Sequence, residues 1–341
     1  RKRCSINIIR SYFQSPPSHV YPNYHPDISK KVNDWLPEVD LVFVDHYEMG
    51  QYVPANTDIP MILHEHNAEY VMWERLAELE KNPLKKALIS LESKRIRRAE
   101  KLYADRSEVV LAAPNDIEEL KRIGVEPHKL EKTYHLGEDF LLEEPEIQFN
   151  DTENCLLFVG TLTWEANIDG LLWFLERVFP KVKALHPEVI FKIVGKNPDQ
   201  RLQDAVRKTP GAILSGFVKD LKPLYSKARV FVIPLRFGSG IKVKLLNAMY
   251  RGIPTVTTPI GTEGLEVISG NQLFSSTDEE DQVKFVSALL SSKEKWEKMR
   301  DRSRQTAKNY TWKTLLADHD KTLNRVVSQN KNSVNYSLNT V

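Results

Sequence analysis

A glycine-rich turn followed by two lysines is the part of the sequence whose residue types and spacing best suit chemistry. The stretch PLRFGSGIKVKLLNAMYRGIPTVTTPIGTEGL occupies residues 234–265. Glycines let a backbone approach a ligand closely, and free amides at a helix start attract negative charge. Basic side chains there add charge-assisted contacts. The pattern predicts a diphosphate site at Gly238, Ser239, Gly240 and Ile241 with the cations Arg236, Lys242 and Lys244. The alternative is that the lysines form a solvated helix face.

Buried strands and amphipathic helices alternate along most of the chain, and this arrangement would position such a turn. Apolar runs typical of strands occupy Leu41–Asp45, Met61–His64, Val109–Ala113, Cys155–Gly160, Val189–Gly195, Val230–Pro234 and Pro254–Thr258. Helical periodicity covers residues 168–184, 221–228 and 241–250, and two later helices are expected near 282–290 and 312–327. The alternation predicts an α/β protein whose parallel sheets carry helices on both faces.

An acidic, polar segment, GEDFLLEEPEIQFNDTEN, interrupts this rhythm after Leu136. Such a segment is typical of a linker between domains. We therefore predict a first domain at 1–140, a linker at 141–153 and a second domain at 154–310. A helix at 311–327 is expected to pack back toward the first domain, and the Asn- and Ser-rich tail at 328–341 is expected to be disordered.

Composition limits the class of protein. The chain has 341 residues, which favours two domains, and its net charge of +2 gives no general attraction to nucleic acid. Two cysteines, Cys4 and Cys155, are typical of a reducing compartment rather than of a disulfide framework. No apolar run is long enough to span a membrane and no signal peptide is visible, so we expect a cytoplasmic protein. The chain opens on Arg1, so its natural start is expected upstream.

Two other turns of the second half are candidate ligand sites. Gly160, Thr161 and Asn167 follow a predicted strand, and ligands of open α/β sheets bind beyond the carboxyl ends of the strands. A plain strand–helix turn is the alternative. The amides of a second turn, Gly216-Phe217-Val218, could hold the edge of a planar base. Neither a dinucleotide fingerprint nor a P-loop is present.

Histidines gather at the end of a strand in the first half, in the segment LHEHNAEY. His64 and His66 flank Glu65, and Asp45-His46 at the preceding strand end is a weaker candidate of the same kind. Zinc binding by His64, Glu65 and His66 together is not expected, because Glu65 on an extended backbone points away from the two rings. We predict no metal site.

Several ordered blocks make the chain resemble the retaining GT-B glycosyltransferases of family 4, the group 1 glycosyl transferases. The blocks are FVGTLTWEANIDGLLWF, GFVKDLKPLYSKARVFVIPLRFGSG, KLLNAMYRGIPTVTTPIGTEGL, LHEHNAEY and ESKRIRRAEKLYADRSEVVLAAPNDIEEL. The resemblance covers nearly all the globular chain and is closest to the subgroup with a glycine-rich loop. It implies two Rossmann-like domains facing a cleft, a UDP- or GDP-linked sugar donor, and metal-independent transfer of a hexose with retention of configuration in polysaccharide biosynthesis.

The resemblance also implies roles for residues. It places His66, Arg236 and Lys242 at the reacting sugar and diphosphate. Donor contacts would come from Gly160, Thr161, Asn167, Gly216, Phe217, Val218, Gly238, Ser239, Gly240, Ile241, Lys244, Asn247 and Glu263. No cofactor is implied beyond the donor substrate, and the acceptor would be a glycan or a lipid-linked sugar.

The chain departs from the family pattern at two positions. The E-x7-E signature would place carboxylates at 239 and 247, where this chain has Ser239 and Asn247. A neutral amide at 247 should hold the ribose hydroxyls less strongly than a carboxylate. Glu263 is a nearby carboxylate that could substitute in part, and the alternative is an ordinary loop residue.

The first domain differs from the family pattern in its length, and one of its segments is strongly basic. Only 36 residues precede the segment PEVDLVFVDH, and they contain no glycine, so we predict a shortened domain without the usual acceptor loop. Residues 81–106 hold nine basic and three acidic side chains, a net of +6. Such a helix can rest on anionic lipids at the inner face of a membrane, or it can be a solvated face.

Two alternatives to an active transferase remain at this point. One is a catalytically impaired nucleotide-sugar-binding protein or partner subunit. The other is a GT-B sugar-nucleotide epimerase, which would need acid and base carboxylates in the cleft.

Overall fold

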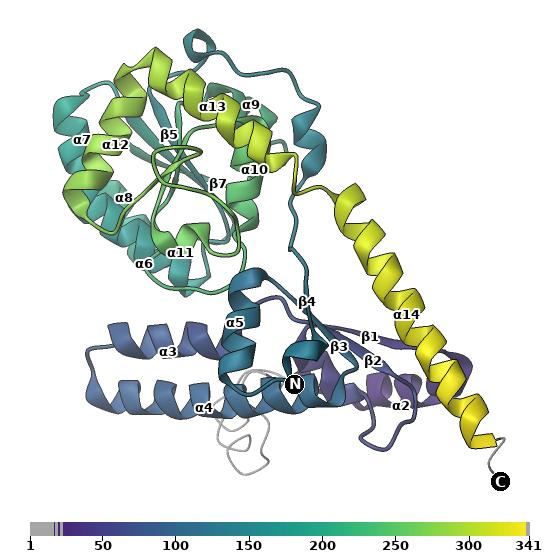
Figure 1. Cartoon of the computed structure of the whole chain (residues 1–341). Helices are drawn as coiled ribbons and strands as arrows, with labels where there is room; N and C mark the ends of the chain where they lie inside the picture. The colour runs from purple at the N-terminus through teal and green to yellow at the C-terminus, as the bar shows by residue number, and fades with distance from the viewer. Residues whose placement is uncertain (1–16, 18–19, 21–22, 339–341) are drawn as a thin grey trace. The chain divides into compact units, whose positions relative to one another are not determined.

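The computed structural model describes Pro17, Val20 and residues 23–338, and these divide into two compact units (Figure 1). The first unit is Arg1–Tyr134 with Leu315–Val341, and the second is His135–Thr314. The division at Tyr134 falls six residues before the end predicted for the first domain. The predicted linker at 141–153 therefore lies within the second unit.

The first unit contains a parallel sheet whose strands follow their order in the chain. It runs β1 (Val42–Asp45), β2 (Met61–His64), β3 (Val109–Ala112) and β4 (Leu130–Lys132). The helices are α2 (Pro26–Trp35), α3 (Glu69–Leu79), α4 (Pro83–Arg106) and α5 (Pro114–Arg122). All strand neighbours are parallel, so every described strand of this sheet ends at the same edge.

Side-chain alternation along the strands divides the core of the first unit into two layers. Val44, Leu63 and Val110 face one side, where they pack with Ile96 of α4 and Leu120 of α5. On the other side, residues such as Ile62 and Leu111 pack against Val326 and Leu323. This alternation is what a pleated strand with both faces covered requires.

The helix that covers the second face is α14 (Trp312–Leu338). Its Thr322 hydroxyl donates a hydrogen bond of 2.6 Å to Glu131 of β4. It corresponds to the helix predicted at 311–327, but it continues to Leu338. The tail predicted to be disordered begins at Ser328, and α14 continues into it as far as Leu338. No proline or glycine interrupts this segment, and Asn and Ser are only moderately unfavourable in a helix.

Helices α3 and α4 lie side by side as an antiparallel pair (Figure 1). The turn between them ends at Asn82, whose side chain accepts hydrogen bonds from the Leu84 and Lys85 amides, with Pro83 in the first helical turn. This is a favourable helix start, because it satisfies two amides that have no partner within the helix. No helix of the described residues is both long and apolar enough to cross a membrane.

The second unit contains a parallel sheet in the doubly wound order. Its strands are β5 (Cys155–Val159), β6 (Ile190–Val194), β7 (Ala212–Gly216), β8 (Val230–Ile233), β9 (Thr255–Thr257) and β10 (Phe274–Ser275), and they lie in the order β10-β9-β8-β5-β6-β7. The order reverses between β5 and β8. Chains leaving neighbouring strands at such a switch point diverge to opposite faces of the sheet and leave a crevice at its carboxyl edge.

Helices cover both faces of this second sheet (Figure 1). They are α6 (Glu165–Trp173), α7 (Phe179–Leu185), α8 (Gln200–Lys208), α9 (Lys222–Lys227), α10 (Val243–Arg251), α11 (Pro259–Thr262), α12 (Glu279–Ser291) and α13 (Lys293–Ala307). The segment predicted as one helix at 168–184 contains a π-helical turn at Phe174–Val178, next to Pro180. Proline cannot donate the regular helical hydrogen bond, which accounts for the irregular turn before it.

One close approach brings α6 against the end of β8. A Cβ atom on Gly170 would lie 2.2 Å from the carbonyl oxygen of Pro234. Glycine therefore lets this helix pack directly on the chain that leads into the glycine-rich loop.

Candidate active site

A cavity of about 390 Å³ lies at the carboxyl ends of β5, β6 and β7 in the second unit. Four residues named from the sequence line it: Gly160, Thr161, Phe217 and Val218. Its other lining residues are Val159, Val194, Gly195, Lys196 and Leu221. Gly216 is the last residue of β7, with φ of +66°, and turns the chain toward this cavity.

The rim of the cavity carries an aromatic ring beside a cation. Phe217 is 62% exposed, and the Lys196 amine lies 4.3 Å from the centre of its ring. An exposed ring is a surface on which a planar group can stack, and the ammonium adds an attraction for negative charge. Lys196 was missed from the sequence, although its position directly after a predicted strand was a usable signal.

The glycine-rich loop leaves β8 and leads into α10. Gly238 and Gly240 have φ of +146° and +70°, values that other residues rarely adopt. Helix α10 starts at Val243, and the side chain of its N-cap residue, Lys242, does not cap the helix amides. The loop and helix start therefore have the backbone geometry that the sequence predicted for an anion site.

Lys244 is half-buried and connects three segments around this loop. Its Nζ donates a 2.6 Å hydrogen bond to Asn167 Oδ1, and Asn167 Nδ2 donates one of 2.8 Å to the Thr161 carbonyl. Burial, helped by the charge of Lys242, lowers the pKa of Lys244 to about 7. Gly160 fits here because a Cβ at this position would lie 3.0 Å from the lysine nitrogen.

The side chain of Lys242 contacts the backbone of the glycine-rich loop that precedes it. Its Nζ donates hydrogen bonds of 3.0 Å to the Ser239 carbonyl and 2.5 Å to the Gly240 carbonyl. Glu263 Oε2 lies 3.6 Å from the same nitrogen. Lys242 is only 4% exposed, so it holds the loop closed on itself in this state.

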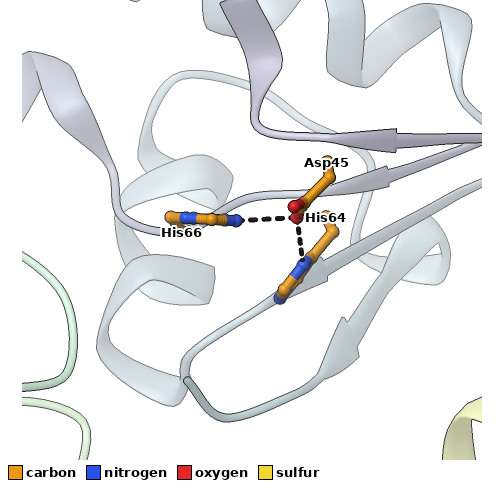
Figure 2. A group of neighbouring side chains, drawn as sticks. All are labelled: Asp45, His64 and His66. Atoms are coloured by element: carbon orange, nitrogen blue, oxygen red, sulfur yellow. Dashed lines mark hydrogen bonds and ion pairs between the residues drawn. The ribbon is translucent and has the colours of Figure 1, made fainter. Parts of the chain in front are cut away.

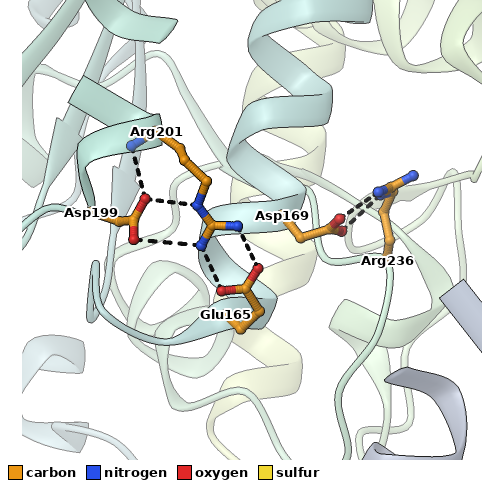
Figure 3. Close-up of polar contacts among 5 residues, drawn as sticks. All are labelled: Glu165, Asp169, Asp199, Arg201 and Arg236. Atoms are coloured by element: carbon orange, nitrogen blue, oxygen red, sulfur yellow. Dashed lines mark hydrogen bonds and ion pairs between the residues drawn. The ribbon is translucent and has the colours of Figure 1, made fainter. Parts of the chain in front are cut away.

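Arg236 is bound by a carboxylate of α6. Its Nε and Nη2 donate hydrogen bonds of 2.8 and 2.5 Å to the two oxygens of Asp169 (Figure 3). Nearby, Arg201 contacts Glu165 on α6 and Asp199, the N-cap of α8. The guanidinium that was predicted to meet the diphosphate is thus already paired, on an exposed part of the surface.

Asn247 holds the chain at the beginning of the second unit. Its Oδ1 accepts a 2.9 Å hydrogen bond from the Glu138 amide. A Cβ on Gly137 would lie 2.0 Å from the same oxygen, so the backbone approaches closely here. The amide that replaces the expected carboxylate therefore has a structural partner.

In the first unit, Asp45 lies between two histidine rings (Figure 2). Its Oδ1 accepts hydrogen bonds of 2.8 Å from His64 Nδ1 and 2.7 Å from His66 Nε2. Partial burial raises the pKa of Asp45, but the hydrogen bonds from His66 and His64 outweigh it and bring the pKa below its ordinary value. Burial lowers the pKa of His64, which favours its neutral form.

His46 extends this group of rings. Its ring centre lies 5.1 Å from that of His66, and its φ of 77° is unusual for a residue other than glycine. Burial lowers the pKa of His46 to about 4, so its ring is neutral at physiological pH. Strained backbone of this kind is concentrated at functional sites.

Residues 153–292 match the protein family described as Glycosyl transferases group 1. An uncharacterized 44.6 kDa protein in the cps region of Klebsiella pneumoniae is 34% identical over 137 residues. That match covers 38% of this chain and 35% of the relative, so it spans about a third of the Klebsiella protein.

Solved structures resemble a larger part of the chain. Anabaena HepE in complex with UDP-glucose has a TM-score of 0.69 at 14% identity, over 88% of this chain and 82% of HepE. Sucrose-phosphate synthase from Thermosynechococcus elongatus has a TM-score of 0.66 at 13% identity, over 90% and 81% of the two chains.

A TarM mutant of S. aureus, in complex with fondaparinux, alpha-GlcNAc-glycerol and UDP, has a TM-score of 0.65 at 13% identity. The likeness covers 88% of this chain and 58% of TarM. At such identities the likeness is one of fold. The predicted GT-B fold, with a parallel sheet in each of two Rossmann-like units, is confirmed.

Glu65 provides a prediction about pH and stability. It is 2% exposed, and its carboxyl group lies close to that of Glu100, which is also buried. Burial and the nearby charge of Glu100 raise the pKa of Glu65 well above its ordinary value. A raised pKa stabilises the fold below pH 4–5, and this stability is lost as the pH rises through the folded-state value.

We therefore expect Glu65→Gln to stabilise the protein at pH 8 and to have little effect near pH 4. The increase in unfolding temperature at pH 8 should be at least about 2–4 °C, the shift that 1 kcal/mol produces in a domain of this size. Calorimetry at both pH values measures it. Glu78→Gln, at an exposed position of α3, is the matched control. Equal shifts at the two pH values would contradict a buried protonated Glu65.

Proposed function

We propose that the chain is a glycosyltransferase that moves a hexose from a UDP- or GDP-linked donor to a glycan or lipid-linked acceptor. The observation that carries the proposal is the cavity at the carboxyl ends of β5, β6 and β7, because its lining residue Gly160 lies against the amine of Lys244, which follows the glycine-rich loop. A stacking surface and an anion site are thereby neighbours, and a nucleoside diphosphate needs both. The group 1 glycosyltransferase match and the UDP-bound structural neighbours support the same conclusion.

The proposed binding mode assigns a part of the donor to each element. The base enters the cavity beside Phe217, Val218 and Lys196, with Gly160 and Thr161 on its other side. The diphosphate approaches Gly238, Ser239, Gly240 and Ile241 at the start of α10. Lys244 supplies positive charge there once it is protonated. His66 is proposed to contact the reacting sugar, as the family resemblance implies.

Transfer is proposed to proceed with retention and without a metal. Leaving-group departure develops negative charge on the diphosphate, and preorganised cations stabilise such charge. Arg236, Lys242 and Lys244 are the candidates for this role. A phosphate would displace the Asp169 carboxylate from Arg236. Glu263, whose Oε2 lies 3.6 Å from the Lys242 amine, would remain beside the glycine-rich loop.

A second candidate function is donor binding without transfer. The specific observation in its favour is that Asn247 is hydrogen-bonded to the Glu138 amide while Ser239 stands where the family pattern has a carboxylate. Weaker binding of the ribose and cations that already have partners would both be consistent with a donor-binding protein or a partner subunit.

A panel of UDP- and GDP-linked sugars distinguishes these functions. Thermal shift first identifies the stabilising nucleotide, and incubation with lipid-linked and glycan acceptors then tests transfer, with the anomeric configuration assigned by NMR. Transfer with retention supports the proposal, and stabilisation alone supports the second candidate. An isomerised donor would indicate an epimerase, and no stabilisation by any nucleotide would contradict donor binding.

Lys244 yields a prediction about proton uptake. Its pKa of about 7 means that the free protein carries mostly neutral lysine here at pH 8. A bound diphosphate favours the charged form, so UDP or GDP binding should take up a proton, and affinity should fall as the pH rises from 7 to 9. Calorimetric titrations at pH 8 in buffers of different ionisation enthalpy measure this uptake.

The matched variants for this test are Lys244→Met and Lys208→Met. The first should abolish proton uptake and weaken binding about tenfold at pH 7, the cost of one charge-assisted contact of about 1.4 kcal/mol. The second removes an exposed lysine at the end of α8 and should behave as wild type. Binding that is independent of pH in the wild type would show that Lys244 does not meet the diphosphate.

We further propose that α4 contacts anionic lipid at the cytoplasmic face of a membrane. Leu84, Leu88 and Leu91 lie at a spacing that places them on one face of the helix, and they are 71%, 51% and 46% exposed. Exposed basic residues accompany them: Lys85, Lys86, Lys94, Arg97 and Arg98. Apolar side chains with a basic surround are typical of an interfacial helix.

Vesicle flotation tests the proposed lipid contact. The protein should bind phosphatidylcholine vesicles that contain phosphatidylglycerol and not vesicles of phosphatidylcholine alone, because the basic residues require anionic headgroups. Changing Leu84 and Leu88 to Ser should reduce binding several-fold, whereas Leu185→Ser, at an exposed position of α7, should not. Equal binding by the wild type, the Leu84 and Leu88 variant and the Leu185→Ser variant would show that α4 does not contact the lipid.

A further inference from the structure

The end of the first sheet brings together three groups with the chemistry of metal ligands. Asp45 and His64 are the last residues of β1 and β2 and are paired in register. His66 follows two residues after His64, so its ring returns to the same side of the chain. Figure 2 shows the Asp45 carboxylate between the two rings, which approach it from different directions.

The three ligand atoms are close enough to share one ion. One atom from each of Asp45, His64 and His66 lies within 4.8 Å of the others. The two contacts to Asp45 Oδ1, of 2.7 and 2.8 Å, are hydrogen bonds. Around a tetrahedral zinc with ligands at about 2.0–2.1 Å, ligand atoms are roughly 3.4 Å apart. Small rotations of exposed Asp45 would provide that separation.

Two imidazoles and one carboxylate select the class of ion. This set suits zinc, cobalt, nickel or ferrous iron, whereas magnesium and calcium prefer oxygen ligands. Three protein ligands leave a position for water. The carboxylate is 64% exposed at its side chain, which gives an ion access from solvent.

We propose that Asp45, His64 and His66 form a binding site for a divalent transition-metal ion of the Zn²⁺ class. The sequence predicted no metal site, because on an extended backbone the side chains of His64, Glu65 and His66 cannot meet at one ion. Glu65 is indeed buried away from the rings, and the third ligand comes from the adjacent strand. The three ligands belong to the first unit, whereas the donor cavity belongs to the second. His66 is shared with the proposed sugar contact, and the ion is given no part in glycosyl transfer.

The chain around the three ligands limits their movement. The His46 amide donates a 2.9 Å hydrogen bond to the His64 carbonyl, and the Glu65 amide donates one of 2.8 Å to the Leu111 carbonyl. These bonds fix the backbone that carries both rings. His319 of α14 lies beside His64, with 6.2 Å between ring centres, and its Nε2 is hydrogen-bonded to Thr133. A ligand set on a fixed backbone requires little reorganisation to bind an ion.

Cobalt titration of the tag-free full chain tests the proposal. Co²⁺ should bind with a stoichiometry of one per chain and give the intense visible absorption of a four- or five-coordinate ion, and Zn²⁺ should displace it. Asp45→Asn, His64→Gln and His66→Gln should each weaken binding tenfold or more, since even indirect partners of a metal site contribute about 10–100-fold. Calorimetry with Zn²⁺ gives the affinities.

His128→Gln is the matched control, because it removes an exposed histidine elsewhere in the first unit. Circular dichroism and thermal unfolding without metal establish that each variant is folded. The proposal is overturned if the wild type shows no visible cobalt absorption, if the three ligand variants bind as the wild type does, or if His128→Gln loses affinity to the same extent.

Discussion

The hydrogen bond from Lys244 to Asn167 is the interaction on which the proposed donor site depends. It joins the first turn of α10 to the first turn of α6, and Asn167 passes the connection on to the Thr161 carbonyl. The loops that follow β5 and β8 are therefore held at a fixed separation across the switch point. Burial and the nearby charge of Lys242 lower the pKa of the Lys244 amine to about 7, so the residue that positions the loops can also respond to an anion.

The two units bring polar side chains together at the ends of their strands in different ways. In a parallel sheet, strand ends converge at one edge, and polar side chains just beyond the strands meet there. In the second unit the strand order reverses between β8 and β5, and a cavity lies at the carboxyl ends of β5, β6 and β7. In the first unit the described strands follow in sequence, and the parallel pairing of β1 with β2 brings Asp45 beside the two histidines.

The sequence predicted those features that depend on local pattern. Each of the seven apolar runs contains a whole strand, because buried parallel strands are continuous apolar segments. β7 was missed because its residues alternate in exposure, and β4 and β10 were missed because they have only three and two residues. The glycine loop was found because positive φ values demand glycine.

Pairing between distant residues could not be derived from the same patterns. Asp45 and His66 are 21 positions apart, and Arg236 and Asp169 are 67 apart. Nothing in either local sequence identifies the partner. The register of adjacent strands decides the first contact, and the close packing of α6 on the chain after β8 decides the second.

The three cations at the glycine loop differ in how readily they can meet a phosphate. The Arg236–Asp169 pair is partly exposed, and such pairs contribute only about 0.2–1 kcal/mol, so a phosphate can replace the carboxylate at little cost. Lys244 needs no change of partner, because a proton is sufficient to charge it. Lys242 is buried against two loop carbonyls, and moving it would leave them without their donor. Lys242 therefore shapes the loop and would have to break these two bonds to reach the diphosphate, whereas Arg236 and Lys244 can meet it at a smaller cost.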